Sequence, residues 1–208
     1  MKLALAAALV AIATIARADD DPGMQLMTVM MRTPAISADG KHVAVYNEDP
    51  GAEKDAKTSL GIFGAAGALE QRISVVPPNT DVAKAKVAAA KLVKLLDDGG
   101  YKRMSRVARV SEKTDKTTYA TELKSEDVVV AIALAKRKLE ITGTRAGKKL
   151  APIAIALPAD GPCKTVDTYG LANTMAGYDA KTGQLAFTLQ AWQHDQVCFA
   201  HGLVVTLK

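Results

Sequence analysis

The sequence predicts an α+β fold with mostly antiparallel sheets and one long amphipathic helix packed on a sheet. Short runs that alternate apolar and polar residues fill most of the chain, and Gly, Asp, Asn or Pro separates them. A single segment, residues 81–98, instead has the 3.6-residue periodicity of a helix. The order strands, helix, strands is typical of an α+β domain and not of repeated parallel βα units.

The first residues have the features of a secretory signal peptide. Lys2 precedes an uncharged apolar run over residues 3–15, and small residues at Ala16 and Ala18 fit the positions that signal peptidase recognises. We expect residues 1–18 to be a signal peptide that is cleaved after Ala18, with an uncleaved amino-terminal anchor as the alternative. The apolar run is shorter than the ~20 residues that span a bilayer, and we expect no membrane span after cleavage.

The rest of the chain is expected to be an exported protein in the periplasm or outside the cell. Residues 19–33 form a lead-in segment whose methionines favour apolar packing over a copper site. Residues 34–208 are predicted to form a single α+β domain, with a candidate sub-boundary near 111–117.

Composition narrows the classes of partner. Without Lys2 and Arg17 the chain has 25 basic and 22 acidic residues, a net charge of +3. This weak positive charge is only a slight indication of a polyanionic partner. Aromatic residues make up 4% of the chain, too few to favour stacking on nucleic acid bases or sugars. We therefore expect no nucleic acid partner, and no motif indicates a cofactor.

The first half of the domain is predicted to be an antiparallel meander followed by the helix. Asp39-Gly40 favours a tight turn, because glycine adopts positive φ without steric cost. Strands are expected at residues 41–46, 59–65 and 69–76. The helix over 81–98 is expected to bury Val82, Ala85, Ala89, Leu92, Val93 and Leu96, and to expose Lys84, Lys91 and Lys94.

The second half is predicted to be strands, and residues 127–135 are apolar enough to be central. A Gly-, Asp- and Thr-rich stretch over about 158–183 has little regular pattern and indicates a long connection. The remaining runs are read as strands at residues 101–110, 117–123, 137–142, 149–157, 184–192 and 196–207.

Residues 36–75 resemble one blade of a TolB-like propeller. The residues that match the blade pattern are Ser37, Asp39, Gly40, Lys41, Val43 and Ala44, and Ala38 replaces the usual proline. A propeller needs about four or more such blades. Because this chain has one good copy, the resemblance implies a hairpin and not a full propeller, and it carries over no function. The whole layout also resembles uncharacterised exported proteobacterial proteins, and this resemblance implies no activity.

Two cysteines, Cys163 and Cys198, are predicted to form a disulfide, because paired cysteines in exported proteins are usually bonded. A zinc site is the alternative, since His194, Cys198 and His201 have ligand-like spacing and Cys163 or Asp195 could complete the set. Alternation along a strand would point Cys198 and His201 to opposite faces. We therefore expect no metal site.

No catalytic motif occurs, whether a Gly-x-Ser-x-Gly elbow, a His-Glu-x-x-His helix or a phosphate loop. The densest basic cluster is a candidate polyanion-binding site made of Lys102, Arg103, Arg106 and Arg109. On a regular strand Arg103 and Arg109 would share one face and Arg106 would take the other, which would divide the charge.

The sequence favours a non-enzymatic exported domain with a binding or structural role in the cell envelope. Its partner would be an envelope protein or polymer that the sequence does not identify. The alternative is an envelope hydrolase that uses acidic residues with His194 or His201. The sequence assigns no catalytic residue.

Overall fold

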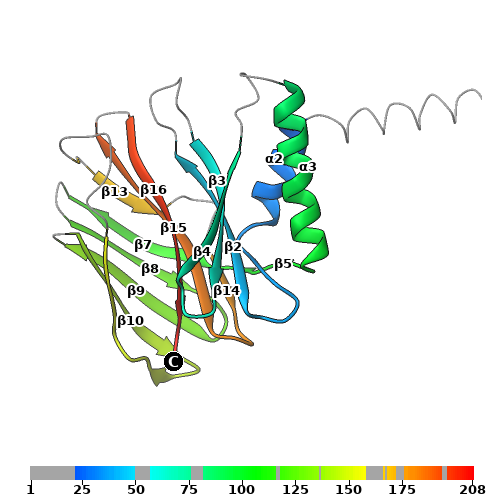
Figure 1. Cartoon of the computed structure of the whole chain (residues 1–208). Coiled ribbons are helices and arrows are strands. Elements are labelled where there is room, and N and C mark those ends of the chain that lie inside the picture. The colour runs from blue at the N-terminus through cyan, green and yellow to red at the C-terminus, as the bar shows by residue number, and fades with distance from the viewer. Residues whose placement is uncertain are drawn as a thin grey trace, which may run out of the picture.

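The computed structural model describes residues 22–49, 57–75, 82–115, 118–135, 137–157, 166, 168–171, 176–193 and 196–208. These residues form two helices and sixteen strands, and the strands pair in three antiparallel sheets (Figure 1). The predicted signal peptide, residues 1–18, lies outside the described residues.

The first sheet contains the predicted meander. Its strand order is β4-β3-β2-β1-β5, with β1 at Ala35–Ile36, β2 at His42–Asp49, β3 at Lys57–Gly64, β4 at Leu69–Val75 and β5 at Lys102–Arg103. The predicted turn lies between β1 and β2, where Gly40 has a φ of 72°. Asp39 Oδ1 closes this turn by accepting hydrogen bonds from the Ser37 hydroxyl at 2.6 Å and from the Lys41 amide at 3.0 Å. The hydroxyl bond lowers the pKa of Asp39.

Two helices cover one face of the first sheet. They are α2 at Pro22–Arg32, within the segment predicted only as a lead-in, and α3 at Val82–Asp98. Alternation in β2 turns Ala44 and Tyr46 toward the helices, where they join an apolar cluster with Leu92 and Leu96. The predicted buried positions Ala85, Ala89, Leu92 and Leu96 are confirmed, as is the exposure of Lys84, Lys91 and Lys94. Val93, also predicted to be buried, is half-buried at the edge of this cluster. The side chain of Val82 lies outside the described part of the chain.

The middle sheet packs on the other face of the first sheet. Its strands are β6 at Ser105–Arg106, β13 at Thr168–Leu171, β14 at Gly177–Asp179, β15 at Gln184–Gln193 and β16 at Gln196–Thr206. Val43 and Val45 of β2 contact the apolar cluster that contains Ala186 and Val204. Successive β2 residues therefore serve two different cores.

The third sheet packs on the far face of the middle sheet. The strand path is β11-β10-β9-β8-β7, and β12 also pairs with β10. The bounds are β7 at Ala108–Thr114, β8 at Thr118–Lys124, β9 at Val128–Ala135, β10 at Lys138–Arg145, β11 at Lys148–Lys149 and β12 at Ile153–Ala156. Its central strand β9 lies where the most apolar run predicted a central strand. Val130, Ile132 and Leu134 are buried against Phe187 and Leu189 in the largest apolar cluster.

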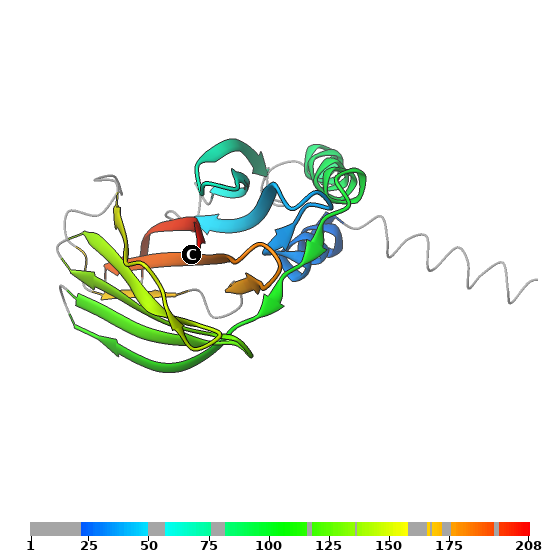
Figure 2. The same ribbon diagram turned by 90° about the horizontal axis from the view of Figure 1, so that it is seen from below.

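The protein is therefore a stack of layers, visible in Figure 2: two helices, the first sheet, the middle sheet and the third sheet. One extended segment, residues 102–114, passes through all three sheets as β5, β6 and β7 in succession. It is the direct covalent link between the helical half and the third sheet.

The predicted α+β class is wrong, because the described residues form a β-rich fold with two short helices. The helix over 81–98 does form, but it covers one face of one sheet and does not organise the other two layers. The stretch predicted as an irregular connection also contains β13 and β14, which complete the middle sheet. No helix among the described residues is long and apolar enough to cross a membrane.

Candidate functional site

The four residues of the predicted basic cluster lie on the segment that links the three sheets. Lys102 and Arg103 belong to β5, Arg106 to β6 and Arg109 to β7. We call these four residues the basic strip. Their backbones pair with a different strand each time, since Arg103 lies opposite Ala35, Arg106 opposite Gly177 and Arg109 opposite Leu123.

Burial along the basic strip does not follow the two-residue alternation of a regular strand. The chain enters a new sheet after each of two buried anchors, Met104 and Val107, which are 4% and 5% exposed. Burial therefore recurs every third residue instead of every second. As a result Lys102, Arg103 and Arg106 are all exposed, and only Arg109 is half-buried.

In addition to these strand pairings, two backbone hydrogen bonds hold the buried anchors of the basic strip against the rest of the fold. The Met104 amide donates to the Pro34 carbonyl at 2.9 Å, and the Val107 amide donates to the Ala176 carbonyl at 3.5 Å. The exposed side chains therefore project from a backbone that is fixed at both anchors. No salt bridge joins Lys102, Arg103 or Arg106 to another described residue.

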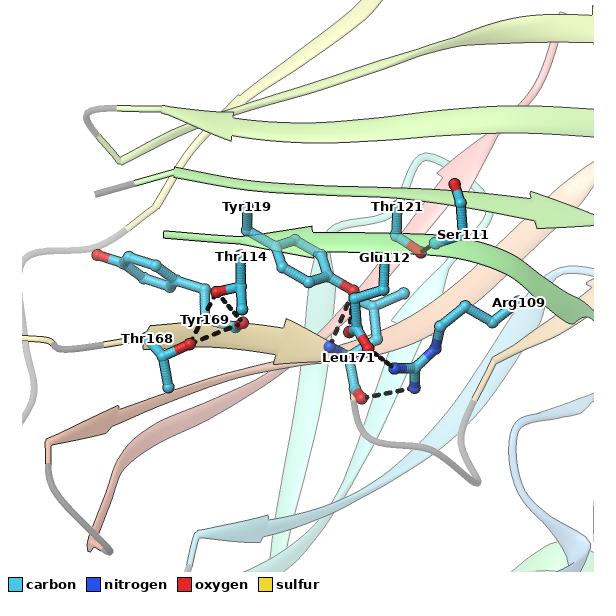
Figure 3. A network of polar contacts seen from close by, with 9 residues as sticks. All are labelled: Arg109, Ser111, Glu112, Thr114, Tyr119, Thr121, Thr168, Tyr169 and Leu171. Atoms are coloured by element: carbon cyan, nitrogen blue, oxygen red, sulfur yellow. Dashed lines mark hydrogen bonds and ion pairs between the residues drawn. The ribbon is translucent and has the colours of Figure 1, made fainter. Parts of the chain in front are cut away.

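Arg109 has a structural role in addition to its charge (Figure 3). Its Nη1 lies 2.5 Å from Glu112 Oε2, and its Nη2 donates to the Leu171 carbonyl at 3.1 Å. The Tyr119 hydroxyl donates to Glu112 Oε1 at 2.9 Å and accepts from the Leu171 amide at 3.3 Å. This polar clamp, Arg109, Glu112, Tyr119 and Leu171, joins β7 and β8 of the third sheet to β13 of the middle sheet.

The clamp is suited to holding the two sheets together and not to acid–base chemistry near neutral pH. Burial raises the pKa of Tyr119 to about 12. The hydroxyl therefore stays protonated and donates to the Glu112 carboxylate. A nucleophilic or basic tyrosine would need a lowered pKa.

A pocket of about 480 Å³ lies between the basic strip and the clamp. Arg106, Val107, Ala108 and Arg109 line one side, and Leu123, Leu171 and Ala176 complete the described lining. Two of these lining residues are arginines, and the others are aliphatic. A larger groove of about 620 Å³ between β12, β16 and the 65–68 turn contains one charged residue, Lys208, among its described lining.

A second polar cluster closes the other end of the middle and third sheets. The Tyr178 hydroxyl donates to Asp127 Oδ2 at 3.4 Å, and Arg145 Nε lies 3.7 Å from the same oxygen. Arg145 also donates to the Ala180 carbonyl, and its guanidinium carbon lies 6.0 Å from the centre of the Tyr178 ring. Burial raises the pKa of Tyr178, so this tyrosine also stays neutral.

The cysteine and histidine predictions fall partly outside the described residues. Cys163, His194 and Asp195 are outside, so the Cys163–Cys198 disulfide stays a prediction. Cys198 is buried among the residues between the middle and third sheets. The described residues contain no group of three His, Cys, Asp or Glu side chains placed to hold a metal ion.

The alternation argument for Cys198 and His201 needs correction. The register of β15 and β16 shifts between Ala191, which pairs with Phe199, and Trp192, which pairs with Val197, and Cys198 is the extra residue of this bulge. His201 is two residues before Leu203, which packs on the same core as Cys198. The two side chains therefore lie on the same face of β16, and alternation along the strand does not place them on opposite faces.

Sequence reasoning found the basic strip but missed Glu112, Tyr119 and Leu171. Glu112 follows Arg109 by three residues and Tyr119 lies in a predicted strand, which are weak local signals. The contribution of Leu171 comes from a segment predicted to be irregular. Comparison with known proteins finds no matching family model, no matching curated protein and no matching solved structure for this chain.

Proposed function

We propose that this protein is an exported, non-catalytic binding domain of the cell envelope that binds an acidic polymer along the basic strip. The observation that carries the proposal is the exposure of Lys102, Arg103 and Arg106 together on one anchored segment. The secretory features of residues 1–18 support the envelope location.

The charge on the basic strip is not offset along the chain. No acidic residue occurs from Lys102 to Ser111, and the first one, Glu112, pairs with Arg109. Arg109 is thus partly neutralised, and the three exposed cations supply most of the attraction. An anion that contacts them meets a locally positive surface on a protein whose overall charge is nearly balanced.

The spacing of the cations favours a linear polymer over a single small anion. In an extended segment Arg103 and Arg106 are about 10 Å apart, and the whole basic strip extends over roughly 23 Å. One phosphate or carboxylate cannot contact all of these groups. Successive charges on a polymer can contact all of them, and several weak contacts together give a higher affinity than any one contact alone.

No observation among the described residues favours the hydrolase alternative. His194 lies outside them, and His201 is half-buried in β16, opposite Leu189. The tyrosines with raised pKa values are held in structural clusters. A binding role needs no group beyond those that the basic strip already presents.

The proposal is tested with polyphosphate and poly-L-glutamate as probes, titrated into the protein at low and at physiological salt. The double variant Arg103→Glu/Arg106→Glu should weaken binding at least about tenfold, because it removes two attractions and adds two repulsions. The matched control is Lys148→Glu/Lys149→Glu, which changes net charge equally at two exposed residues of β11.

Equal weakening by both double variants would contradict the proposal, because it would show that overall charge and not the basic strip controls binding. Binding that does not weaken as salt rises would also contradict it, since exposed charges are screened by salt.

A further inference from the structure

A second candidate site lies on the opposite side of the first sheet from the middle sheet, along α3. A groove of about 550 Å³ runs between α3 and β4, the edge strand of the first sheet. Its described lining includes Ile73 of β4 and, from α3, Ala83, Lys84, Val87, Ala88 and Lys91. We call this the α3 groove.

The helix residues of the α3 groove recur with the spacing of one helical face. Val87 stands near the middle of this face and is 55% exposed, one of five large hydrophobic side chains that are exposed among the described residues. An exposed apolar side chain beside other apolar residues in a concave site is typical of a ligand-binding groove.

The charged residues in the described lining of the groove are both lysines. Lys84 and Lys91 lie seven residues apart, so they are about 10 Å apart along the helix axis, one toward each end of the apolar face. None of the described residues that line the groove is acidic. The acidic residues at the end of α3 lie elsewhere and are paired, Asp97 with Arg32 and Asp98 with Lys94.

We propose that the α3 groove binds a single fatty acid, with the acyl chain on the apolar floor and the carboxylate beside Lys91. A hydrocarbon chain has no hydrogen-bonding groups to satisfy, which suits a floor of Ile73, Ala83, Val87 and Ala88. The groove volume is in the range of small-ligand sites, about 300–1,000 Å³.

This site is separate from the basic strip and does not depend on the function proposed above. The groove lies between α3 and β4, whereas the basic strip lies on β5, β6 and β7. Variants of one site should therefore leave the other site unchanged.

The test is calorimetric titration of the protein with monomeric dodecanoate and, separately, with dodecyltrimethylammonium, which has the same chain length and the opposite charge. Dodecanoate should occupy one saturable site and bind at least about tenfold more tightly than the cation. Val87→Asp should abolish this binding, and Lys91→Glu should weaken it about three- to tenfold. Lys94→Gln, on the same helix but outside the groove, should leave it unchanged.

Folding of each variant is checked by circular dichroism, and Lys91→Glu tests the site independently if Val87→Asp is poorly folded. The strip variant Arg103→Glu/Arg106→Glu should bind dodecanoate as the wild type does. Equal binding of the two amphiphiles, or unchanged binding by Lys91→Glu, would overturn the proposal. Binding to phosphatidylglycerol vesicles or to an acidic amphipathic peptide, without a site for monomeric dodecanoate, would also overturn it and indicate a membrane surface or a partner helix.

Discussion

Replacing Tyr119 with Phe removes one hydroxyl from the centre of the clamp between the middle and third sheets. Tyr119 is 1% exposed, and its hydroxyl is both a donor to Glu112 and an acceptor from the Leu171 amide. The variant keeps the aromatic ring and its packing. It leaves the amide of Leu171, a residue that is 4% exposed, without this acceptor.

An unsatisfied buried donor costs about 1–3 kcal/mol, and we expect Tyr119→Phe to lower the free energy of unfolding by that amount. For a chain of this size the loss corresponds to a fall in the melting midpoint of about 2–12 °C. Urea unfolding followed by circular dichroism measures the change directly. The urea dependence should keep its slope, since the surface exposed on unfolding hardly changes.

The matched control is Thr114→Val, which removes a hydroxyl from the same seam at an exposed position, where it lies 2.7 Å from the Thr168 hydroxyl. This change should stay within about 0.5 kcal/mol, because water replaces the lost hydrogen bond. The reasoning is refuted if Tyr119→Phe costs no more than Thr114→Val.

Three further outcomes are expected. Leu92→Ala should lower the free energy of unfolding by about 2–5 kcal/mol, because Leu92 is 1% exposed between α3 and the first sheet. Lys91→Ala should change it by no more than about 0.5 kcal/mol in urea unfolding. Equal changes would mean that the helix faces are assigned wrongly. The pKa of Tyr119 in the folded protein, about 12, is above the ordinary value of 10.0. The contribution of Tyr119 to stability is therefore complete below pH 10.0 and is lost as the pH rises toward about 12. In an ultraviolet titration Tyr119→Phe should remove an ionisation at high pH, and an unchanged curve would contradict this. Alkylation of unreduced, denatured protein should label neither Cys163 nor Cys198. Reduction should lower the free energy of unfolding by about 4 kcal/mol, because the unfolded chain regains loop-closure entropy. Two labelled thiols would refute the disulfide.

The sequence identified the elements whose patterns are local. The turn at Asp39-Gly40 needs only glycine at positive φ and a short acidic side chain, and both are visible in four residues. The helix Val82–Asp98 follows from the periodicity of one segment, and the central strand Val128–Ala135 from the apolar composition of another. These elements occur at or near their expected positions.

What sequence reasoning missed depends on contacts between distant segments. Strands β13 and β14 are short and rich in Gly and Tyr, and they form where the long strand β15 offers its edge to both. A propensity argument over a few residues cannot detect such a partner. Their assignment as an irregular connection made the domain look less β-rich than it is.

The basic strip is the case in which the position was predicted and the geometry was not. A two-residue alternation assumes that one strand stays in one sheet. Met104 and Val107 instead anchor the chain at two successive sheet changes, so Arg103 and Arg106 are both exposed. The bulge at Cys198 likewise interrupts the two-residue alternation in β16.

The most direct test of the proposed function is to locate the bound anion by nuclear magnetic resonance. Amide shifts of the isotope-labelled protein are recorded while polyphosphate is added at low salt. The largest changes should fall on residues 102–110 and on the strand neighbours Ala35, Leu123 and Gly177, and they should reverse when salt is raised. Changes centred on Lys148 and Lys149 of β11, or spread evenly over all surface lysines, would contradict binding at the basic strip.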